Sequence, residues 1–302
     1  MTVTNHTIGE LRQFGSNLAE LVSRLVAAGT PCPLWDTKQV AWRHETEDRN
    51  AILFLMLKLS GAVSAVNAMI VLGERGFSFE AAILARAVSD ADLCIAFMLP
   101  TLEEISQQWP SVKQKEMLDE FFKETWNDPA HPYEDSRQRP HIVIKDLKEG
   151  LARFQGKNTE MNPHDTGQTA LQMMRYLSDY THMAYPRMME LRHDGGGYRL
   201  NGEQQCSSAF NVAGIADTLR HCAFMADCVA LYVTQMFRSI AKLAEIQGNS
   251  EVACKLEKKV SSFAPIQIAL ESLHARIEKA TMSGSGNGIP SSQKLLRDFK
   301  GK

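Results

Sequence analysis

Apolar residues recur every three or four positions along most of the chain, the spacing of one buried face on an α-helix. This pattern predicts a first helix over residues 8–28, which Gly29 ends. Further segments with the same spacing cover 101–125, 141–154, 166–184, 207–248 and 250–280. Alternating strand patterns are too few for a sheet core. The sequence therefore predicts an all-α fold.

Two strongly apolar segments, about 45–75 and 79–99, predict a long antiparallel helical hairpin at the centre of a multi-helix bundle. Gly73 and Gly76 mark a connection so short that the two helices must pack against each other. The second segment is apolar nearly all round, which is typical of a central helix. We expect another helix to approach the first one closely at its small residues, Ser60, Gly61, Ser64, Ala65 and Ala68.

Nothing at the start of the chain has the basic and apolar runs of a signal peptide. The stretch 51–73 is long enough to span a membrane, but it contains Lys58, which is costly in a bilayer. We expect a buried core helix and no membrane partner. The six cysteines form no Cys-x-x-Cys pair and lie mostly in helical patterns, where a thiol acts as a small apolar group. These features predict a cytoplasmic protein.

Length and charge favour one ordinary folded unit. We predict a single helical domain over 1–280 and a flexible Gly/Ser linker with a short basic tail over 281–302. The 33 basic and 35 acidic residues give a net charge of -2, so any nucleic-acid contact must be local. Walker, dinucleotide, GxSxG, HExxH and zinc-finger motifs are absent from the sequence, and we predict no cofactor.

A charged pair, Arg86 and Asp90, interrupts an apolar face of the helix predicted over 79–99. The two side chains lie one turn apart and can pair with each other. Charges in such a position must be paired, because burial removes their hydration. The pair either locks the helix against a polar neighbour or belongs to a ligand site. Asp92 lies on a neighbouring face and can take part in a different contact.

Polar residues also gather in the segment RYLSDYTH, which contains Arg175, Ser178, Asp179 and His182. Histidine can move protons near neutral pH, and the planar fork of an arginine can hold a phosphate. This combination suits phosphodiester cleavage without a metal. The alternative is that His182 is a structural histidine near a helix end.

The two groups of residues could form one site. If their helices face each other, Arg86 and Asp90 join Arg175, Ser178 and His182 in a polar pocket between otherwise apolar helices.

A third pattern, Asp217 and His221, places a carboxylate and an imidazole one turn apart. Di-metal helical bundles need four carboxylates and paired Glu-x-x-His motifs, which this sequence lacks. We therefore predict no metal site, and we expect Asp217 and His221 to face solvent or pair locally.

The segments GERGFSFEAAILARAVSDADLCIAFML and RYLSDYTHMAYP resemble an uncharacterised bacterial all-helical family with a Gly-turn, an Arg-plus-acid helix and a Ser-x-x-x-His helix. The likeness covers roughly 45–245. More distantly, the chain is similar to the higher eukaryotes and prokaryotes nucleotide-binding (HEPN) superfamily of helical, often dimeric proteins. Members carry an Arg followed four to six residues later by His. Arg175 and His182 have six residues between them, although Tyr176 stands where the superfamily usually has a polar residue.

This resemblance implies a metal-independent endoribonuclease, often found in toxin or phage-defence systems. It makes His182 the proton shuttle and Arg175 the phosphate ligand, while Arg86, Asp90, Ser178 and Asp179 would bind RNA or a nucleotide. It also implies a homodimer. The rival hypothesis is a non-catalytic helical scaffold or interaction protein, such as a sensor or neutralising partner in a defence module. The sequence leaves open whether the protein is an enzyme.

Overall fold

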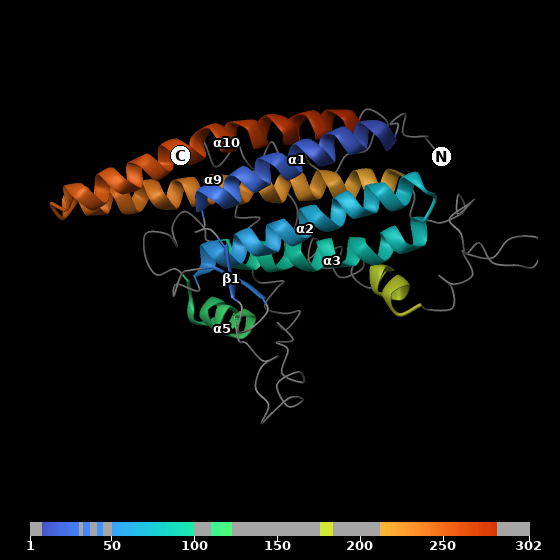
Figure 1. Cartoon of the computed structure of the whole chain (residues 1–302), viewed down its shortest axis with the longest axis horizontal. Coiled ribbons are helices and arrows are strands. Elements are labelled where there is room, and N and C mark those ends of the chain that lie inside the picture. The colour runs from blue at the N-terminus through green and yellow to red at the C-terminus, as the bar shows by residue number, and fades with distance from the viewer. Residues whose placement is uncertain are drawn as a thin grey trace, which may run out of the picture.

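The computed structural model describes residues 8–29, 33–36, 41–44, 50–99, 110–122, 176–183 and 212–282. The long helices within these ranges are α1 (Ile8–Gly29), α2 (Ala51–Glu74), α3 (Ser78–Met98), α9 (Val212–Ile246) and α10 (Ser250–Met282) (Figure 1). Shorter elements are α5 (Val112–Phe121), a helical segment over 176–181, and the strands β1 (Pro33–Asp36) and β2 (Ala41–His44). The predicted all-α class is confirmed, with one short antiparallel hairpin, β1–β2, that the sequence pattern did not predict.

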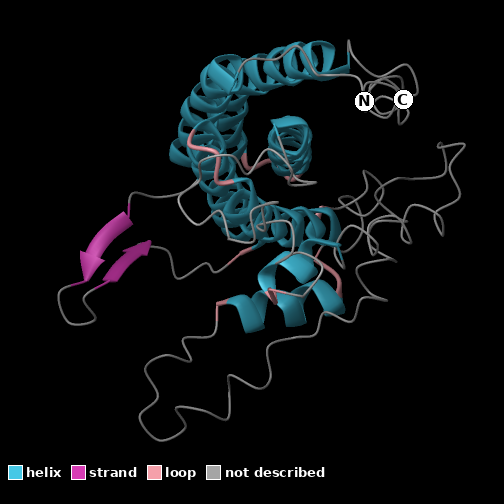
Figure 2. Cartoon of the chain, turned by 90° about the vertical axis from the view of Figure 1, so that its right-hand side faces the viewer, coloured by secondary structure: helices cyan, strands magenta, loops and turns pink. Residues whose placement is uncertain are grey.

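Helix α9 lies at the centre of the bundle. It contacts α1, α2, α3 and α10, and Figure 2 shows the other long helices curving around it. Almost every residue from 222 to 237 is buried, so this part of α9 has no solvent-facing side. Helix α9 therefore depends on neighbours in several directions.

The predicted hairpin is formed by α2 and α3, which pack against each other along their lengths. A tight turn joins them, with Gly76 at φ 80°, in the left-handed region that glycine adopts without strain. Helix α2 begins at Ala51, later than the predicted start near residue 45. The reason is Asn50, whose side chain accepts a hydrogen bond from the Leu53 N–H at 3.0 Å and caps the helix.

Helix α1 lies close against α2 at Gly15. The Asn67 amide donates to the Gly15 carbonyl at 3.3 Å and to the Val63 carbonyl at 3.0 Å. A Cβ at Gly15 would lie 2.7 Å from Asn67 Oδ1. The predicted close approach near Gly61 is wrong, because Gly61 is exposed and a Cβ there would meet nothing within 4 Å. Ser64 and Ala68 also face solvent.

Among the described helices, α2 is the one long and apolar enough to cross a membrane. Its buried residues, such as Leu59 and Val66, belong to the main apolar core. The helix contacts α1, α3 and α9. In this fold α2 is therefore a core helix, as the sequence analysis expected.

The structure describes only parts of the other predicted helices. Within the predicted helix 101–125 the structure describes α5, and within 166–184 it describes a helix over 176–181. The predicted helix 141–154 lies outside the described residues. The predicted tail also lies outside them, except that its first two residues complete α10.

A buried polar contact joins α9 to α10. Asp227 Oδ2 lies 3.5 Å from His274 Nδ1, and the two side chains are 1% and 2% exposed. The Phe224 ring lies beside the imidazole at 5.5 Å between centroids. Buried charges need partners, so this contact favours the alignment of α9 and α10 that brings Asp227 and His274 together.

The glycines supply a matched test of helix packing. We expect Gly15→Ala to lower the free energy of unfolding by about 1–3 kcal/mol, because the new methyl group displaces Asn67. Gly61→Ala should raise it by about 0.5–1 kcal/mol through helix propensity alone. Urea denaturation followed by circular dichroism measures both. Equal effects of the two substitutions would show that α1 does not pack on α2 at Gly15.

The buried contact supplies a second test. His274→Leu should cost about 3–5 kcal/mol, because it leaves the Asp227 carboxylate buried without its imidazole. The double variant Asp227→Leu/His274→Leu should recover much of that loss, since the carboxyl group that lost its partner is removed as well. Denaturation of the two variants and the unsubstituted protein tests this order. A double variant less stable than His274→Leu contradicts it.

Candidate functional site

One face of α3 carries a row of polar residues. Arg86, Asp90 and Cys94 follow each other at intervals of four and therefore share this face. Arg86 Nη1 lies 2.8 Å from Asp90 Oδ1, which confirms the predicted pairing. The Arg86 side chain is 21% exposed and that of Asp90 is 49% exposed. The pair therefore lies where the apolar core meets solvent, and a ligand could reach it.

A second cation, Lys58, reaches the same face from α2. Its charge acts on both Asp90 and Cys94. The Lys58 ammonium also lies 5.0 Å from the centre of the Phe121 ring of α5 and 5.7 Å from that of Phe54. Two cations, Arg86 and Lys58, thus lie near Asp90 on this part of α3, while Asp92 also acts on Cys94.

Burial affects the pKa values of Asp90 and Cys94 more than the nearby cations do. Burial raises the pKa of Asp90 above its ordinary value, and Arg86 and Lys58 partly oppose that shift. Burial also raises the pKa of the Cys94 thiol, again opposed by Lys58. The thiolate is the nucleophilic form of cysteine, so Cys94 is not an activated nucleophile at neutral pH.

Two residues of the second predicted group, Ser178 and Asp179, lie on the helical segment 176–181. Leu177 and Tyr180 are buried, and the Tyr180 ring packs edge-on against Phe79 at 5.3 Å between centroids. Ser178 is half-buried, and Asp179 is exposed.

His182 lies at the end of this segment and is exposed. The backbone N–H of His182 donates to the Ser178 carbonyl at 2.8 Å, and this bond closes the last helical turn. Met183 follows at φ 50°, a left-handed conformation that ends the helix. The imidazole is therefore accessible from solvent rather than placed in the core.

The contact between Tyr180 and Phe79 brings the two predicted groups to the same side of α3. Phe79 and Arg86 are seven residues apart, so they share a face and lie about 10 Å apart along the helix axis. At the other end of α3, Gln114 of α5 donates to the Phe97 carbonyl at 2.9 Å. The Arg86 and Asp90 pair thus lies between two short helices. Arg175 is outside the described residues, and the joint pocket stays a prediction.

A different polar cluster, which the sequence analysis did not assemble, lies between α3 and α9. Asp92 of α3 interacts electrostatically with His221 of α9. The charge of His221 opposes the effect of burial, which raises the pKa of Asp92. On α9, Asp217 pairs with Arg220 and lies 3.8 Å from His221, which confirms the predicted local pairing. The described ranges contain no group of three His, Cys, Asp or Glu side chains arranged as metal ligands.

Two of the other described cysteines behave as the sequence predicted. Burial raises the pKa of the Cys222 and Cys228 thiols, with nearby carboxylates adding to the shift. Both residues therefore act as small apolar groups within the core. Cys254 differs, because it is exposed on α10.

The protonation of Asp92 should make stability depend on pH. Burial raises its pKa in the folded protein, with His221 in opposition, so its contribution to stability is complete below about pH 4 and declines as pH rises through the folded pKa. Asp92→Asn removes this decline. The difference in free energy of unfolding between Asp92→Asn and the unsubstituted protein should therefore grow from pH 4 to pH 7.

Urea denaturation at several pH values measures this difference. His221→Ala removes the opposing charge, so the decline should extend to higher pH in that variant. A constant difference between Asp92→Asn and the unsubstituted protein across this range would contradict a raised pKa.

Comparisons with known proteins give no independent family assignment. Neither protein-family models, nor curated proteins, nor solved structures gave a match to this chain. The functional argument therefore rests on the chain's own residues.

Proposed function

We propose that this chain is a HEPN-like protein that binds RNA and cleaves it without a metal ion. The observation that carries this proposal is the packing of Tyr180 on Phe79, which brings the segment of Ser178 and His182 to the Arg86 side of α3. His182 and Arg175 would act on the phosphodiester. Arg86, Asp90, Ser178 and Asp179 would bind the substrate.

The charges on this face of α3 suit a phosphate. Arg86 and Lys58 are both cations near this face, and the Arg86 side chain is partly exposed, at 21%. A phosphate oxygen can accept from such a donor. The site is local, in keeping with a chain whose net charge is only -2.

The accessible imidazole of His182 fits RNA cleavage in which the ribose 2′-hydroxyl is the nucleophile. A histidine can take the proton of a ribose 2′-hydroxyl, whose oxygen then attacks the adjacent phosphorus while the 5′-oxygen leaves and gains a proton. The products are a 2′,3′-cyclic phosphate and a 5′-hydroxyl. DNA lacks the 2′-hydroxyl and cannot follow this route.

The resemblance also carries the biological setting of the proposal. A HEPN-like ribonuclease would act in the cytoplasm, within a toxin or phage-defence system, and as a homodimer. Its partners would be RNA or a nucleotide and a further protein.

The second candidate function is a non-catalytic scaffold or interaction protein. It is favoured by the buried contact between Asp227 and His274, which joins α9 to α10 and shows that this chain uses buried polar residues for packing. On this view the Arg86 and Asp90 pair specifies helix packing.

The decisive experiment compares RNA and DNA oligonucleotides of the same sequence in excess chelator. We expect cleavage of RNA alone, with cyclic phosphate ends, and a loss of at least about 100-fold in His182→Ala, the scale of general acid and base catalysis. Arg86→Ala should weaken RNA binding and raise KM.

His221→Ala is the matched control, because His221 is a half-exposed histidine on α9 whose neighbour is Asp217. This variant should cleave RNA at the rate of the unsubstituted protein. Absence of cleavage by the unsubstituted protein, or equal cleavage by His182→Ala, would leave the scaffold as the better hypothesis.

A further inference from the structure

Helices α9 and α10 form an antiparallel hairpin that projects beyond the other described helices (Figure 1). The end of the bundle is marked by Phe263, which stacks on Phe237 at 5.4 Å and lies beside Gly29, the last residue of α1. Beyond this level α9 continues to Ile246, a further length of about 14 Å at the rise of an α-helix. We call residues 238–262 the projecting hairpin.

One face of α9 changes from buried to exposed as it enters the projecting hairpin. Val229, Met236 and Leu243 follow at intervals of seven and share this face. Val229 and Met236 are 0% and 7% exposed, whereas Leu243 is 54% exposed. The same face is thus apolar throughout, but it loses its cover where the bundle ends.

Four aliphatic side chains make up the uncovered surface. Ile240 and Ile246 flank Leu243 on α9 and are 42% and 81% exposed. Val252, at the start of α10, is 40% exposed. The contact between the two helices uses other residues, since Ala241, Ala244 and Val260 are buried. We call Ile240, Leu243, Ile246 and Val252 the apolar patch.

Basic side chains border this patch. Lys242 precedes Leu243 on α9, while Lys255 and Lys259 follow Val252 at intervals that keep them on its face of α10. Lys259 Nζ lies 5.3 Å from the centre of the Phe237 ring, so this face of α10 turns toward α9.

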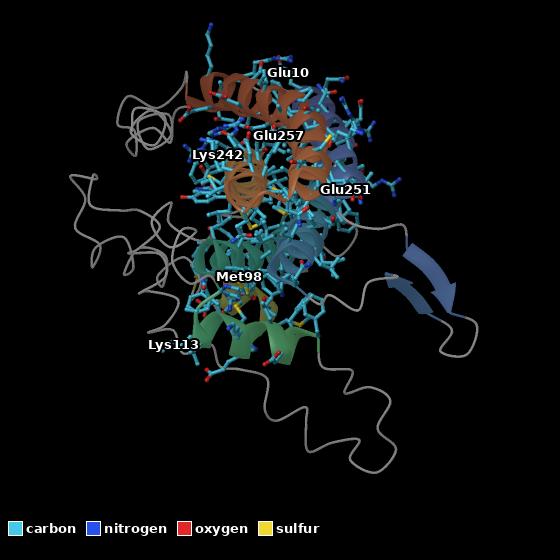
Figure 3. All side chains as sticks on the ribbon, turned by 90° about the vertical axis from the view of Figure 1, so that its left-hand side faces the viewer. Glu10, Met98, Lys113, Lys242, Glu251 and Glu257 are labelled. Carbon is cyan, nitrogen blue, oxygen red and sulfur yellow. The ribbon has the colours of Figure 1, made fainter. Side chains whose placement is uncertain are left out.

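Two acidic side chains of the projecting hairpin, Glu245 and Glu257, lie away from the patch, whereas Glu251 pairs with Lys255 at its border. Glu245 is about 200° round α9 from Leu243 at 100° per residue. Figure 3 looks onto the tip and shows Lys242 and Glu251 on opposite sides of the hairpin, with Glu257 above it. Glu251 pairs with Lys255, but both side chains are more than two thirds exposed, so the pair is weak. The projecting hairpin contains five basic and three acidic residues, so its net charge is positive.

We propose that the apolar patch is a docking site for an amphipathic helix with acidic flanks on a partner protein. Such a helix would cover Ile240, Leu243 and Ile246 with its apolar face and place carboxylates near the bordering lysines. It would continue the packing that α9 receives inside the bundle. This proposal does not depend on RNA cleavage.

Charge and composition argue against the other occupants. A second copy docked through the same patch would bring Lys242, Lys255 and Lys259 close to the same lysines of its partner. An interfacial membrane helix buries a long, continuous apolar face, whereas this patch has three aliphatic side chains on α9 and one on α10. An acidic helix satisfies both the apolar patch and its basic border.

The test uses two synthetic helical peptides as probes. Both have leucines at positions i, i+3, i+4 and i+7; one has glutamates at the flanking positions and the other has lysines. Fluorescence anisotropy with the full chain should show at least about tenfold tighter binding of the glutamate peptide, the effect of 1.4 kcal/mol. Equal binding of the two peptides, or no binding, overturns the proposal.

Variants of the full chain place the binding on the patch. Leu243→Glu/Ile246→Glu should weaken binding of the glutamate peptide at least tenfold, and Lys242→Glu/Lys255→Glu should weaken it while leaving the patch intact. Ile268→Glu is the matched control, because Ile268 is 66% exposed on α10 outside the patch, and it should bind as the unsubstituted protein does. Circular dichroism checks that each variant is folded.

Two further measurements distinguish the other occupants. A dimer seen by light scattering that Leu243→Glu/Ile246→Glu dissociates would overturn the proposal in favour of a second copy. Co-sedimentation with vesicles of phosphatidylcholine and phosphatidylserine that depends on Leu243 would overturn it in favour of a membrane. A monomer that ignores vesicles and binds the glutamate peptide supports it.

Discussion

A helix buried on nearly every side exists only where other elements supply its neighbours and where its polar side chains find partners inside the protein. This constraint governs the structure, because α9 meets it over residues 222–237. Thr234 is satisfied within α9, since its hydroxyl donates to the Ala230 carbonyl at 2.7 Å. Asp227 lies 3.5 Å from His274 of α10, so the pairing of α9 with α10 involves a buried polar contact as well as apolar packing.

The sequence predicted helices well because burial of one face imposes a regular spacing on the chain. The hairpin of α2 and α3 agrees closely with its prediction at the turn, where Gly76 is an unambiguous signal. Periodicity does not show which small residue meets a neighbour. Gly61 and Gly15 are both helical glycines, yet only Gly15 lies against another helix, and that difference arises from tertiary packing.

The same distinction between local and distant contacts explains the polar residues. Arg86 and Asp90 lie one turn apart, so their pairing could be predicted from spacing alone. The meeting of Asp92 with His221 depends on how α3 packs against α9, which no local pattern records. One signal was present: Asp92 interrupts an apolar face of α3 that includes Val88, and a carboxylate in that position needs a partner.

Helix α3 carries charged residues on two of its faces. On one face, Arg86 and Lys58 outnumber Asp90, and on the other, Asp92 lies toward Asp217 and His221. An anionic ligand is attracted to Arg86 and Lys58 on the first face, whereas on the second face Arg220 is already paired with Asp217. A phosphate would therefore approach the face that also carries Phe79 and, through it, the segment of Ser178 and His182.

The projecting hairpin lies outside both of these faces. It shares α9 with the core, but its exposed patch begins only after Phe237, where the stacked Phe263 closes the bundle. Changes at Leu243 can therefore alter an interaction surface without disturbing the core residues that hold α9 in place. The fold thus allows the proposed ligand site on α3 and the proposed docking surface on the projecting hairpin to be altered independently of each other.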